Sequence, residues 1–271
     1  MRKSIDSSVK VFSVAFALVI MPTSINAALV GDLLVYYNFD GQTNDQAGNA
    51  GAAVLNGGAT LTGSGFIGGA LDTSGNGAAV VPAGAHLSAA NTNDAMSVSF
   101  WQFNNQVKNS STFWVHSPAA GANDRGFQAH VPWGNGTVFF DQSGCCNPAQ
   151  RLTTVGTSLG VWQHFVFQRD SAGNREIWID GFLAASAGVA ETLDSFNGII
   201  TIGAEGNNHS NFFNGRIDEF AIWSAPLSQA DIQSLAGGAS TSSILFVPEP
   251  ATATLGLIVA GTLLVRRRRA A

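Results

Sequence analysis

The chain has 271 residues, of which 45% are hydrophobic and only 11% are charged, with 31 glycines and 18 phenylalanines. Residues 28–250 hold six basic and 17 acidic residues, a net charge of −11. This acidic balance excludes a nucleic-acid-binding protein, because phosphate backbones require clustered Lys and Arg. Many glycines and aromatic residues favour strands and turns over helices.

The N-terminal segment 1–27 is typical of a cleaved export signal. Arg2, Lys3 and Lys10 form a basic start, the apolar run VFSVAFALVIM covers 11–21, and the small residue Ala27 suits a cleavage site. The apolar run is too short to span a bilayer comfortably, and its basic start favours a secretory signal helix over a buried N-terminal helix.

Apolar and polar residues alternate through most of the body between residues 32 and 223. The clearest runs cover 96–103, 161–169, 175–181, 198–203 and 215–223. Runs with a period of two, separated by Gly, Asn and Asp, predict antiparallel strands. Tight hairpin turns are expected at Ser171–Asn174 and at Asp180-Gly181.

One helix is expected after the strands. Ser228 and Asp231 form a capping-box pattern, Ile232 and Leu235 supply an apolar side, and the Gly pair at 237–238 ends the segment. About 210 residues of this kind fit one two-sheet sandwich. The alternation predicts that eight apolar side chains form the core between the sheets: Phe39, Phe100, Phe165, Phe167, Ile177, Ile179, Phe220 and Ile222.

Six segments occur in an order that resembles the bacterial laminin-G-like, concanavalin A-like jelly-roll family. They are YYNFDGQTNDQAGNAG, GFIGGALD, MSVSFW, the W-x-H at 162–164, RDSAGNREIWIDG and NGRIDEFAIWSAPLSQADIQSL. The resemblance implies an all-β, two-sheet antiparallel jelly-roll sandwich over residues 28–238. Family members mostly bind sugars, glycoconjugates or proteins, often beside a calcium ion.

A calcium site is one hypothesis for the loops. Asp40, Asn44 and Asp45 follow the first expected strand, and Asp218 lies in the last one. In related sandwiches these two strands lie close together, so the four residues are candidate oxygen ligands for Ca²⁺. The alternative is that these side chains bond nearby backbone N–H groups in turns.

Aromatic residues around HVPWGNGTVFFD suggest a sugar-binding surface. Trp114, Phe127 and Trp133 flank this segment, and Trp133 lies beside a Gly-rich turn. Arg125 and Arg151 are candidate contacts for an anionic group in the same region. The alternative is that the aromatic side chains belong to the core, as strand aromatics generally do.

The two cysteines are adjacent, Cys145-Cys146, in a turn marked by Gly144 and Asn147-Pro148. Two thiolates without C-x-x-C spacing are too few for a structural zinc site. In an exported protein they form either a vicinal disulfide or a pair of free thiols.

Catalysis is not indicated. On one strand, Glu176 and Asp180 would lie about 13 Å apart, whereas paired glycosidase carboxylates need about 5–9.5 Å. Asp218 and Glu219 are adjacent and are expected on opposite sheet faces. The sequence has no G-x-S-x-G or H-E-x-x-H motif, and its five histidines lack ligand spacing. His164 is interpreted as a hydrogen-bonded structural residue.

The C-terminal region is interpreted as a linker (239–247) followed by a membrane-directed signal (248–271). Pro248-Glu249-Pro250 is expected to be extended, residues 251–265 form a short apolar transmembrane helix of about 22 Å, and Arg266, Arg267, Arg268 and Arg269 follow. Positive charge stays on the cytoplasmic side, so the body is expected outside the inner membrane. The alternative is an ordinary tail anchor.

This order of features resembles the PEP-CTERM sorting signal of Gram-negative bacteria, which implies processing by an exosortase and delivery to the cell surface beside exopolysaccharide. The sequence therefore predicts an exported, non-catalytic binding module for extracellular polysaccharide or glycoconjugate. Two alternatives are a structural matrix protein without a specific ligand and, less favoured, a polysaccharide-active glycosidase.

Overall fold

The computed structural model describes residues 32–118, 125–188, 191–206, 209–241 and 243. The predicted signal peptide, transmembrane segment and sorting signal, including Pro248–Pro250 and Arg266–Arg269, lie outside these ranges. Within them, no helix combines the length and apolar character needed to cross a membrane.

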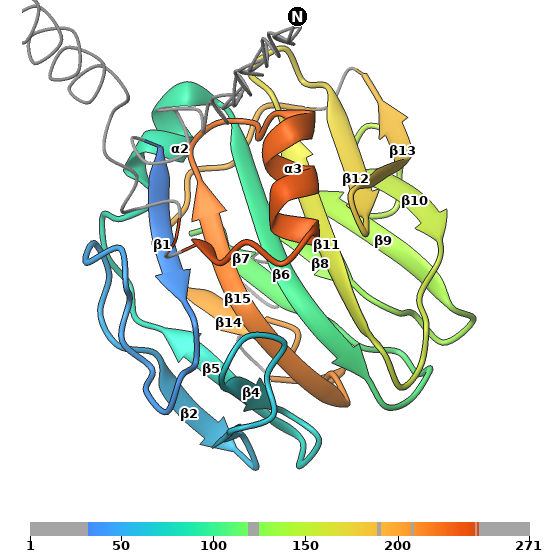
Figure 1. The fold of residues 1–271 in the computed structure, drawn as a ribbon. Coiled ribbons are helices and arrows are strands. Elements are labelled where there is room, and N and C mark those ends of the chain that lie inside the picture. Colours follow the sequence, from blue (N-terminus) through green and yellow to red (C-terminus); the bar gives the residue numbers. More distant parts are fainter. Residues whose placement is uncertain (1–31, 119–124, 189–190, 207–208, 242, 244–271) are drawn as a thin grey trace, which may run out of the picture.

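The body is a sandwich of two antiparallel sheets (Figure 1), as the sequence predicts. The front sheet in Figure 1 has the order β13 (Phe182–Ala187), β12 (Arg175–Ile179), β11 (Trp162–Arg169), β6 (Met96–Asn104), β15 (Gly215–Trp223), β4 (Ala70–Asp72) and β3 (Thr60–Thr62), and β1 (Leu33–Tyr37) also pairs with β15. The back sheet has the order β10 (Arg151–Val155), β9 (Thr137–Gln142), β8 (Arg125–His130), β7 (Phe113–His116), β14 (Ile200–Ile202), β5 (Gly77–Val81) and β2 (Val54–Gly57).

Alternating side chains from both sheets form the core between them. Phe100 is its centre, with ring contacts to Phe113, Phe165, Phe167 and Phe220 at centroid distances of 5.8–6.2 Å. All eight predicted core residues lie in this cluster, and only Ile179 is partly exposed. Each fully buried apolar side chain contributes about 1.5–3 kcal/mol.

The predicted hairpins are confirmed. β11 pairs with β12 across residues 170–174, where Asp170 accepts hydrogen bonds from the N–H groups of Ala172 and Asn174. The next turn consists of Asp180 and Gly181, both with positive φ, +51° and +82°. This is the backbone of a two-residue turn that matches the twist of the flanking strands.

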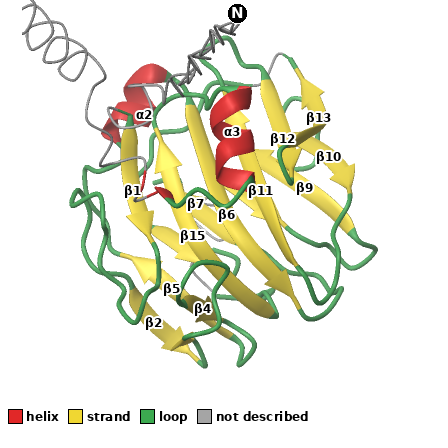
Figure 2. Ribbon diagram, viewed as in Figure 1, coloured by secondary structure: helices red, strands yellow, loops and turns green. Residues whose placement is uncertain are grey.

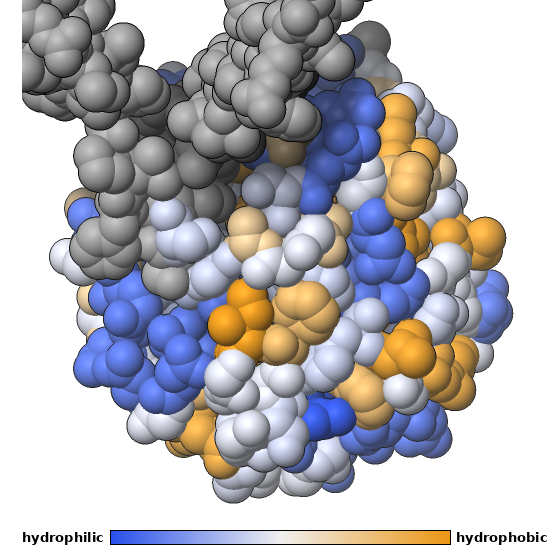
Figure 3. All heavy atoms as spheres, in the orientation of Figure 1, coloured by the Kyte–Doolittle hydropathy of each residue, from blue (hydrophilic) through white to orange (hydrophobic). Residues whose placement is uncertain are grey.

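The outer face of the front sheet carries a second cluster of buried apolar side chains among polar ones. Helix α3 (Gln229–Ala236) lies over this face in Figure 2 and buries Ile232 and Leu235 against Trp178 and Trp223. Ser228 and Asp231 form the predicted capping box. A short second helix, α2 (Ser88–Asn93), precedes β6. Figure 3, in the same orientation, shows hydrophobic residues in separate groups among polar ones, several of them on the side of β10 and β13.

The expectation that Asp218 and Glu219 face opposite sides of the sheet is wrong. The pairing of β15 with β6 shifts between Asp218 and Ala221, and Glu219 has a φ of +52°. This β-bulge places two residues where a regular strand has one, between the core residues Ile217 and Phe220. Both carboxylates therefore lie on the outer side of the front sheet.

Candidate functional site

The outer face of the back sheet is largely polar. One row of directly paired residues crosses five strands: Arg151, Asp141, Gln128, Trp114 and Thr201. Each alternates along its strand with core residues, which fixes its side chain on the outer face. Four of the five are completely buried despite this position, Arg151 being the exception. The row therefore forms a buried layer on the outer face of the back sheet, which we call the floor.

Asp141 organises one end of this floor. Arg151 binds it in a bidentate pair, with Nε–Oδ1 and Nη2–Oδ2 distances of 2.6 Å each. His130 Nε2 lies 3.5 Å from Oδ2, and the Ser111 hydroxyl lies 2.8 Å from His130 Nδ1. Burial by itself raises the pKa of Asp141, but hydrogen bonds from Arg151 and His130 and their charges bring it below the ordinary value. Asp141 is thus a fixed anion that orients two donors.

A cavity of about 250 Å³ opens above this end of the sheet. Cys145 and Cys146, which line it, form a disulfide in the structure, so we call it the disulfide pocket. Its lining consists of two cysteines, two aromatic rings and four polar or charged side chains: Cys145, Cys146, Trp133, Phe139, Arg125, His130, Arg151 and Glu205.

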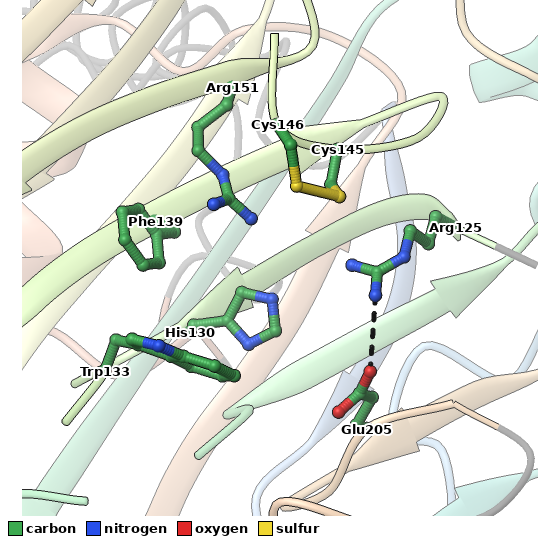
Figure 4. A pocket seen from close by; sticks show the side chains of 8 residues that line it. All are labelled: Arg125, His130, Trp133, Phe139, Cys145, Cys146, Arg151 and Glu205. Atoms are coloured by element: carbon green, nitrogen blue, oxygen red, sulfur yellow. Dashed lines mark hydrogen bonds and ion pairs between the residues drawn. A yellow bond between two sulfur atoms is a disulfide. The ribbon is translucent and has the colours of Figure 1, made fainter. Parts of the chain in front are cut away.

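The close-up in Figure 4 shows how these side chains face one another. Trp133 and Phe139 lie on one side, and the Arg125–Glu205 pair lies on the other. His130 lies between them, and the sulfur–sulfur bond extends from the loop above, between the two guanidinium groups. The pocket therefore offers flat apolar surfaces together with hydrogen-bonding groups, the usual composition of a small-molecule site.

Both arginines are held in position by two partners. Arg125 lies 5.0 Å from the centre of the Trp114 ring, and its Nη2 is 3.4 Å from Glu205 Oε1. Asn211 donates a hydrogen bond to Glu205 in turn. The Arg151 guanidinium lies 4.1 Å from the centre of the Phe139 ring, in addition to its pair with Asp141. A cation over a ring face and an ion pair together limit side-chain rotation.

Trp133 reaches the pocket from the turn between β8 and β9. Its backbone N–H donates to the carbonyl of Thr137, and its carbonyl accepts from the N–H of Gly136. The N–H of Gly134 donates to the side chain of Asn109. These bonds hold the indole, which is partly exposed, at the pocket wall. Its ring centre lies 4.8 Å from that of His130, at an interplanar angle of 74°.

The aromatic residues named from the sequence have three different environments. Trp133 lines the pocket, as do Arg125 and Arg151. Trp114 is fully buried in the floor beneath Arg125. The inclusion of Phe127 in a sugar-binding surface is wrong, because its ring packs against Phe113 and Phe140 in the core.

Six residues of the row and the pocket lining were not predicted from the sequence: Phe139, His130, Asp141, Gln128, Thr201 and Glu205. Four of these alternate with core residues on β8 and β9, so the period-two pattern identifies them as outward-facing. The pattern does not give the strand register that aligns these residues.

Gln128 is also fully buried, and among the described residues its amide nitrogen and oxygen have no hydrogen-bond partner.

The four candidate calcium ligands are divided between two places. Asp45 accepts hydrogen bonds from four backbone N–H groups, those of residues 36, 47, 49 and 50. Asn44 bonds to Gln42. Asp40 and Asp218 instead meet at loop 65–69, where Asp40 accepts from Gly69 and Asp218 accepts from residues 66 and 67. In the described part of the chain, no group of three His, Cys, Asp or Glu side chains could hold a metal ion.

Asp40 does border a second cavity, of about 420 Å³, with Leu61, Thr62 and four glycines. One of these, Gly68, has a φ of +65°, and a Cβ atom there would lie 2.2 Å from Asp40 Oδ1. The loop thus needs glycine for its close approach to the carboxylate. Asp40 is the only member of the predicted calcium set that lines this cavity.

The remaining acid–base candidates have structural partners. Glu176 accepts hydrogen bonds from Gln168 and Trp178, and Asp180 accepts from the backbone of His164. His164 Nε2 lies 2.8 Å from the Ser99 hydroxyl, and burial lowers the pKa of this imidazole to about 3. The structural interpretation of His164 is confirmed, since it remains neutral and hydrogen-bonded.

These features define an all-β domain of two antiparallel sheets with a jelly-roll fold, and the sequence agrees with this at the family level. The profile of the concanavalin A-like lectin/glucanases superfamily matches residues 72–233, more than half of the chain. The chain belongs to this superfamily. No curated protein matches it.

Solved structures share the fold at low sequence identity. Domain 4 of AbnA, an extracellular arabinanase from Geobacillus stearothermophilus in complex with arabinotriose, is 21% identical with a TM-score of 0.60, over 76% of this chain and 98% of that one. The binding domain of botulinum neurotoxin DC in complex with SialylT is 18% identical with a TM-score of 0.55, over 80% of this chain and 53% of that one. The binding domain of Paraclostridial Mosquitocidal Protein 1 is 17% identical with a TM-score of 0.55, over 77% and 52%. The chain thus spans about half the length of the two toxin structures.

Proposed function

We propose that the protein is a non-catalytic glycan-binding module and that the disulfide pocket is its ligand site. The observation that carries this is the pairing, in one cavity, of flat apolar groups with guanidinium groups held by ion pairs. A sugar ring has apolar C–H faces and a rim of hydroxyl groups, and such a cavity complements both.

The superfamily and the solved structures support a glycan or glycoconjugate as the ligand. The AbnA domain was solved with arabinotriose, and the neurotoxin DC binding domain with SialylT. A botulinum neurotoxin type C structure is 18% identical with a TM-score of 0.58, and cell entry of that toxin depends upon interaction with two ganglioside molecules. Both neutral and acidic glycans therefore belong in the test.

A glycan array with and without Trp133→Ala tests the proposal. We expect the purified protein to bind a defined set of glycans and the variant to lose about tenfold or more in affinity, equal to about 1.4 kcal/mol. The matched control is Trp162→Ala, because Trp162 is a partly exposed tryptophan on the outer face of the front sheet, 5.3 Å from Arg216. Equal binding by all three proteins would reject this pocket. No glycan binding together with self-association would favour the structural matrix alternative.

The proposed absence of catalysis rests on the carboxylates near the pocket. Asp141 is completely buried in its pair with Arg151, and Glu205 is held by Arg125 and Asn211. Glycoside hydrolysis uses a pair of carboxyl groups, and both carboxylates near the pocket are bound to structural partners. Release of reducing sugars from a polysaccharide panel would overturn this part of the proposal.

Calcium binding and surface delivery are separate proposals. Calorimetric titration with Ca²⁺ tests the first proposal, with Asp40→Asn as the informative variant because Asp40 borders the second cavity.

The sequence signals at both ends support export, exosortase processing and a place at the cell surface beside exopolysaccharide. Mass spectrometry of surface-extracted protein tests this, since processing removes Arg266–Arg269.

A further inference from the structure

The cysteine pair joins neighbours in the sequence. A disulfide stabilises a fold mainly by closing a loop in the unfolded chain, and the effect grows with loop length. Cys145 and Cys146 have a sequence separation of 1, so their bond closes no loop between distant parts of the chain. The bond therefore has little to contribute to global stability, and a local role is needed to account for it.

The loop that carries the pair is held in place by other bonds. Ser143 and Gly144 donate N–H groups to the backbone of Gly126 and Arg125 on β8. On the other side of the loop, Arg175 donates to the carbonyl of Pro148. These contacts attach both ends of the loop to the sandwich without any help from sulfur.

What the bond does determine is the surface of the pocket. Both cysteines line the cavity, and Figure 4 shows the sulfur–sulfur bond between the guanidinium groups of Arg125 and Arg151. Cys146 has a φ of +84°, a conformation that residues other than glycine rarely adopt. Linking the two side chains removes their rotation and holds both sulfur atoms as one flat, polarisable, apolar face.

We propose that this disulfide is a wall of the ligand site, facing the ring of a bound sugar opposite Trp133, so that affinity depends on the oxidation state of the pair. This inference rests on the proposed function of the pocket. The cavity of about 250 Å³ is smaller than the roughly 300–1,000 Å³ typical of ligand pockets. It accommodates a single sugar ring with an apolar surface on each side and arginine donors at its hydroxyl rim.

Reduction is the chemical step that removes the wall. An added dithiol supplies two electrons and two protons, the sulfur–sulfur bond breaks, two thiols form, and the reductant becomes a cyclic disulfide. The two thiol side chains then rotate independently. Because the loop keeps its backbone bonds, the fold should persist while the shape of the pocket changes.

The experiment compares glycan-array binding and thermal melting for four forms of the full chain. These are the oxidised protein, the protein treated with dithiothreitol, the double variant Cys145→Ala/Cys146→Ala, and Pro148→Ala as the control in the same loop. We expect affinity to fall about tenfold or more on reduction and in the double variant, and to return on reoxidation. Pro148→Ala should bind like the oxidised protein, and the melting temperature of each form should stay within about 2 °C.

Two results would overturn the inference and are distinguishable from failure of the proposed function. Unchanged binding after reduction and in the double variant, while Trp133→Ala loses binding, would keep the pocket and reject the disulfide wall. A fall of about 10 °C or more in melting temperature on reduction would show a structural disulfide instead. Failure of the oxidised protein to bind any glycan would reject the proposed function itself.

Discussion

The outer faces of the two sheets differ in what covers them. On the front sheet, Trp178, Ala221 and Trp223 point outward and are buried beneath α3. On the back sheet, the outward side chains are Trp114, Gln128 and their neighbours in the polar row, and the disulfide pocket lies at one end. The same alternation of strand residues thus places an apolar cluster beneath α3 on one face, beside polar groups such as His164 and Asp218, and a polar floor on the other.

We infer a division between the two outer faces: the front one contributes mainly to stability, and the back one contributes to ligand binding. An apolar outer face gains free energy only when another element covers it, and α3 does this for the front sheet. A polar outer face instead requires hydrogen-bond partners for every buried group. On the back sheet Asp141 has such partners in Arg151 and His130, whereas the buried Gln128 amide has none among the described residues, and two guanidinium groups remain at the pocket. Three variants test this division.

The largest effect is expected from Trp223→Ala, on the front face. Its indole is 1% exposed and packs with Ile232 and Leu235 of α3. Replacing a buried tryptophan with alanine should lower the free energy of unfolding by about 3–5 kcal/mol, as measured by urea denaturation. Glycan affinity per folded molecule should not change. A loss of affinity with unchanged stability would contradict the division between the faces.

Arg151→Met should affect both stability and binding, because it removes one partner of a carboxylate with no exposure. Losing a hydrogen bond to a buried charged group should cost about 1.5–3 kcal/mol. The pKa of Asp141 is now below its ordinary value, so its stabilisation is present at neutral pH and is lost as pH falls through the folded-state pKa.

In Arg151→Met the pKa of Asp141 should rise, so that the stability this carboxyl loses on acidification should shrink or reverse. Urea denaturation between pH 3 and pH 7 measures the change, with the range set by the ordinary carboxyl pKa of about 4. The double variant Arg151→Met/Asp141→Asn is the control, because it removes the buried charge that the single variant leaves unpaired. If the unmodified protein loses as much stability on acidification as this double variant, Asp141 is not the source of that loss.

The smallest effect is expected from Asp218→Asn, at the bulge on the front face. Burial raises the pKa of Asp218 to about 7, with the charge of Glu219 adding to the rise and three backbone N–H groups opposing it. The folded state therefore holds a proton that the unfolded state releases near pH 4. Stability from this group is complete below that pH and is lost as pH rises through about 7.

Subtracting the stability curve of Asp218→Asn from that of the unmodified protein isolates this slope. The subtraction is needed because His164, with its pKa lowered to about 3 by burial, contributes a slope of the opposite sign. Its stabilisation is present above the ordinary histidine pKa of about 6.5 and is lost as pH falls from there. A difference curve that is flat between pH 4 and pH 7 would contradict the raised pKa of Asp218.

Much of the fold could be predicted because its signals are local. The phenylalanines at 100, 165 and 167 follow the alternating pattern and lie in the core, and the hairpin turns and the cap at Ser228 have short-range signatures. The bulge at Glu219 was not predictable in this way. A strict alternation assigns one face to each residue, whereas an inserted residue shifts the faces without altering the local composition.

The candidate site shows the same limit. Trp133 was singled out because a Gly-rich turn follows it, and Arg125 and Arg151 because they lie in the same region of the chain. The sequence contains no such signal for His130, Asp141 and Glu205, since isolated polar residues in strands are common.

By itself, the sequence determined the strand pattern, the core aromatics, the capped helix and the adjacent cysteines, because each depends on neighbours a few residues apart. Only the tertiary structure decided that Arg151, Asp141, Gln128 and Trp114 lie in one row and that the cysteine pair borders the same cavity as Trp133. The physical reason is strand register. Side chains on different strands become neighbours through hydrogen-bond pairing and bulges, and a shift of one residue would exchange the core face with the outer face.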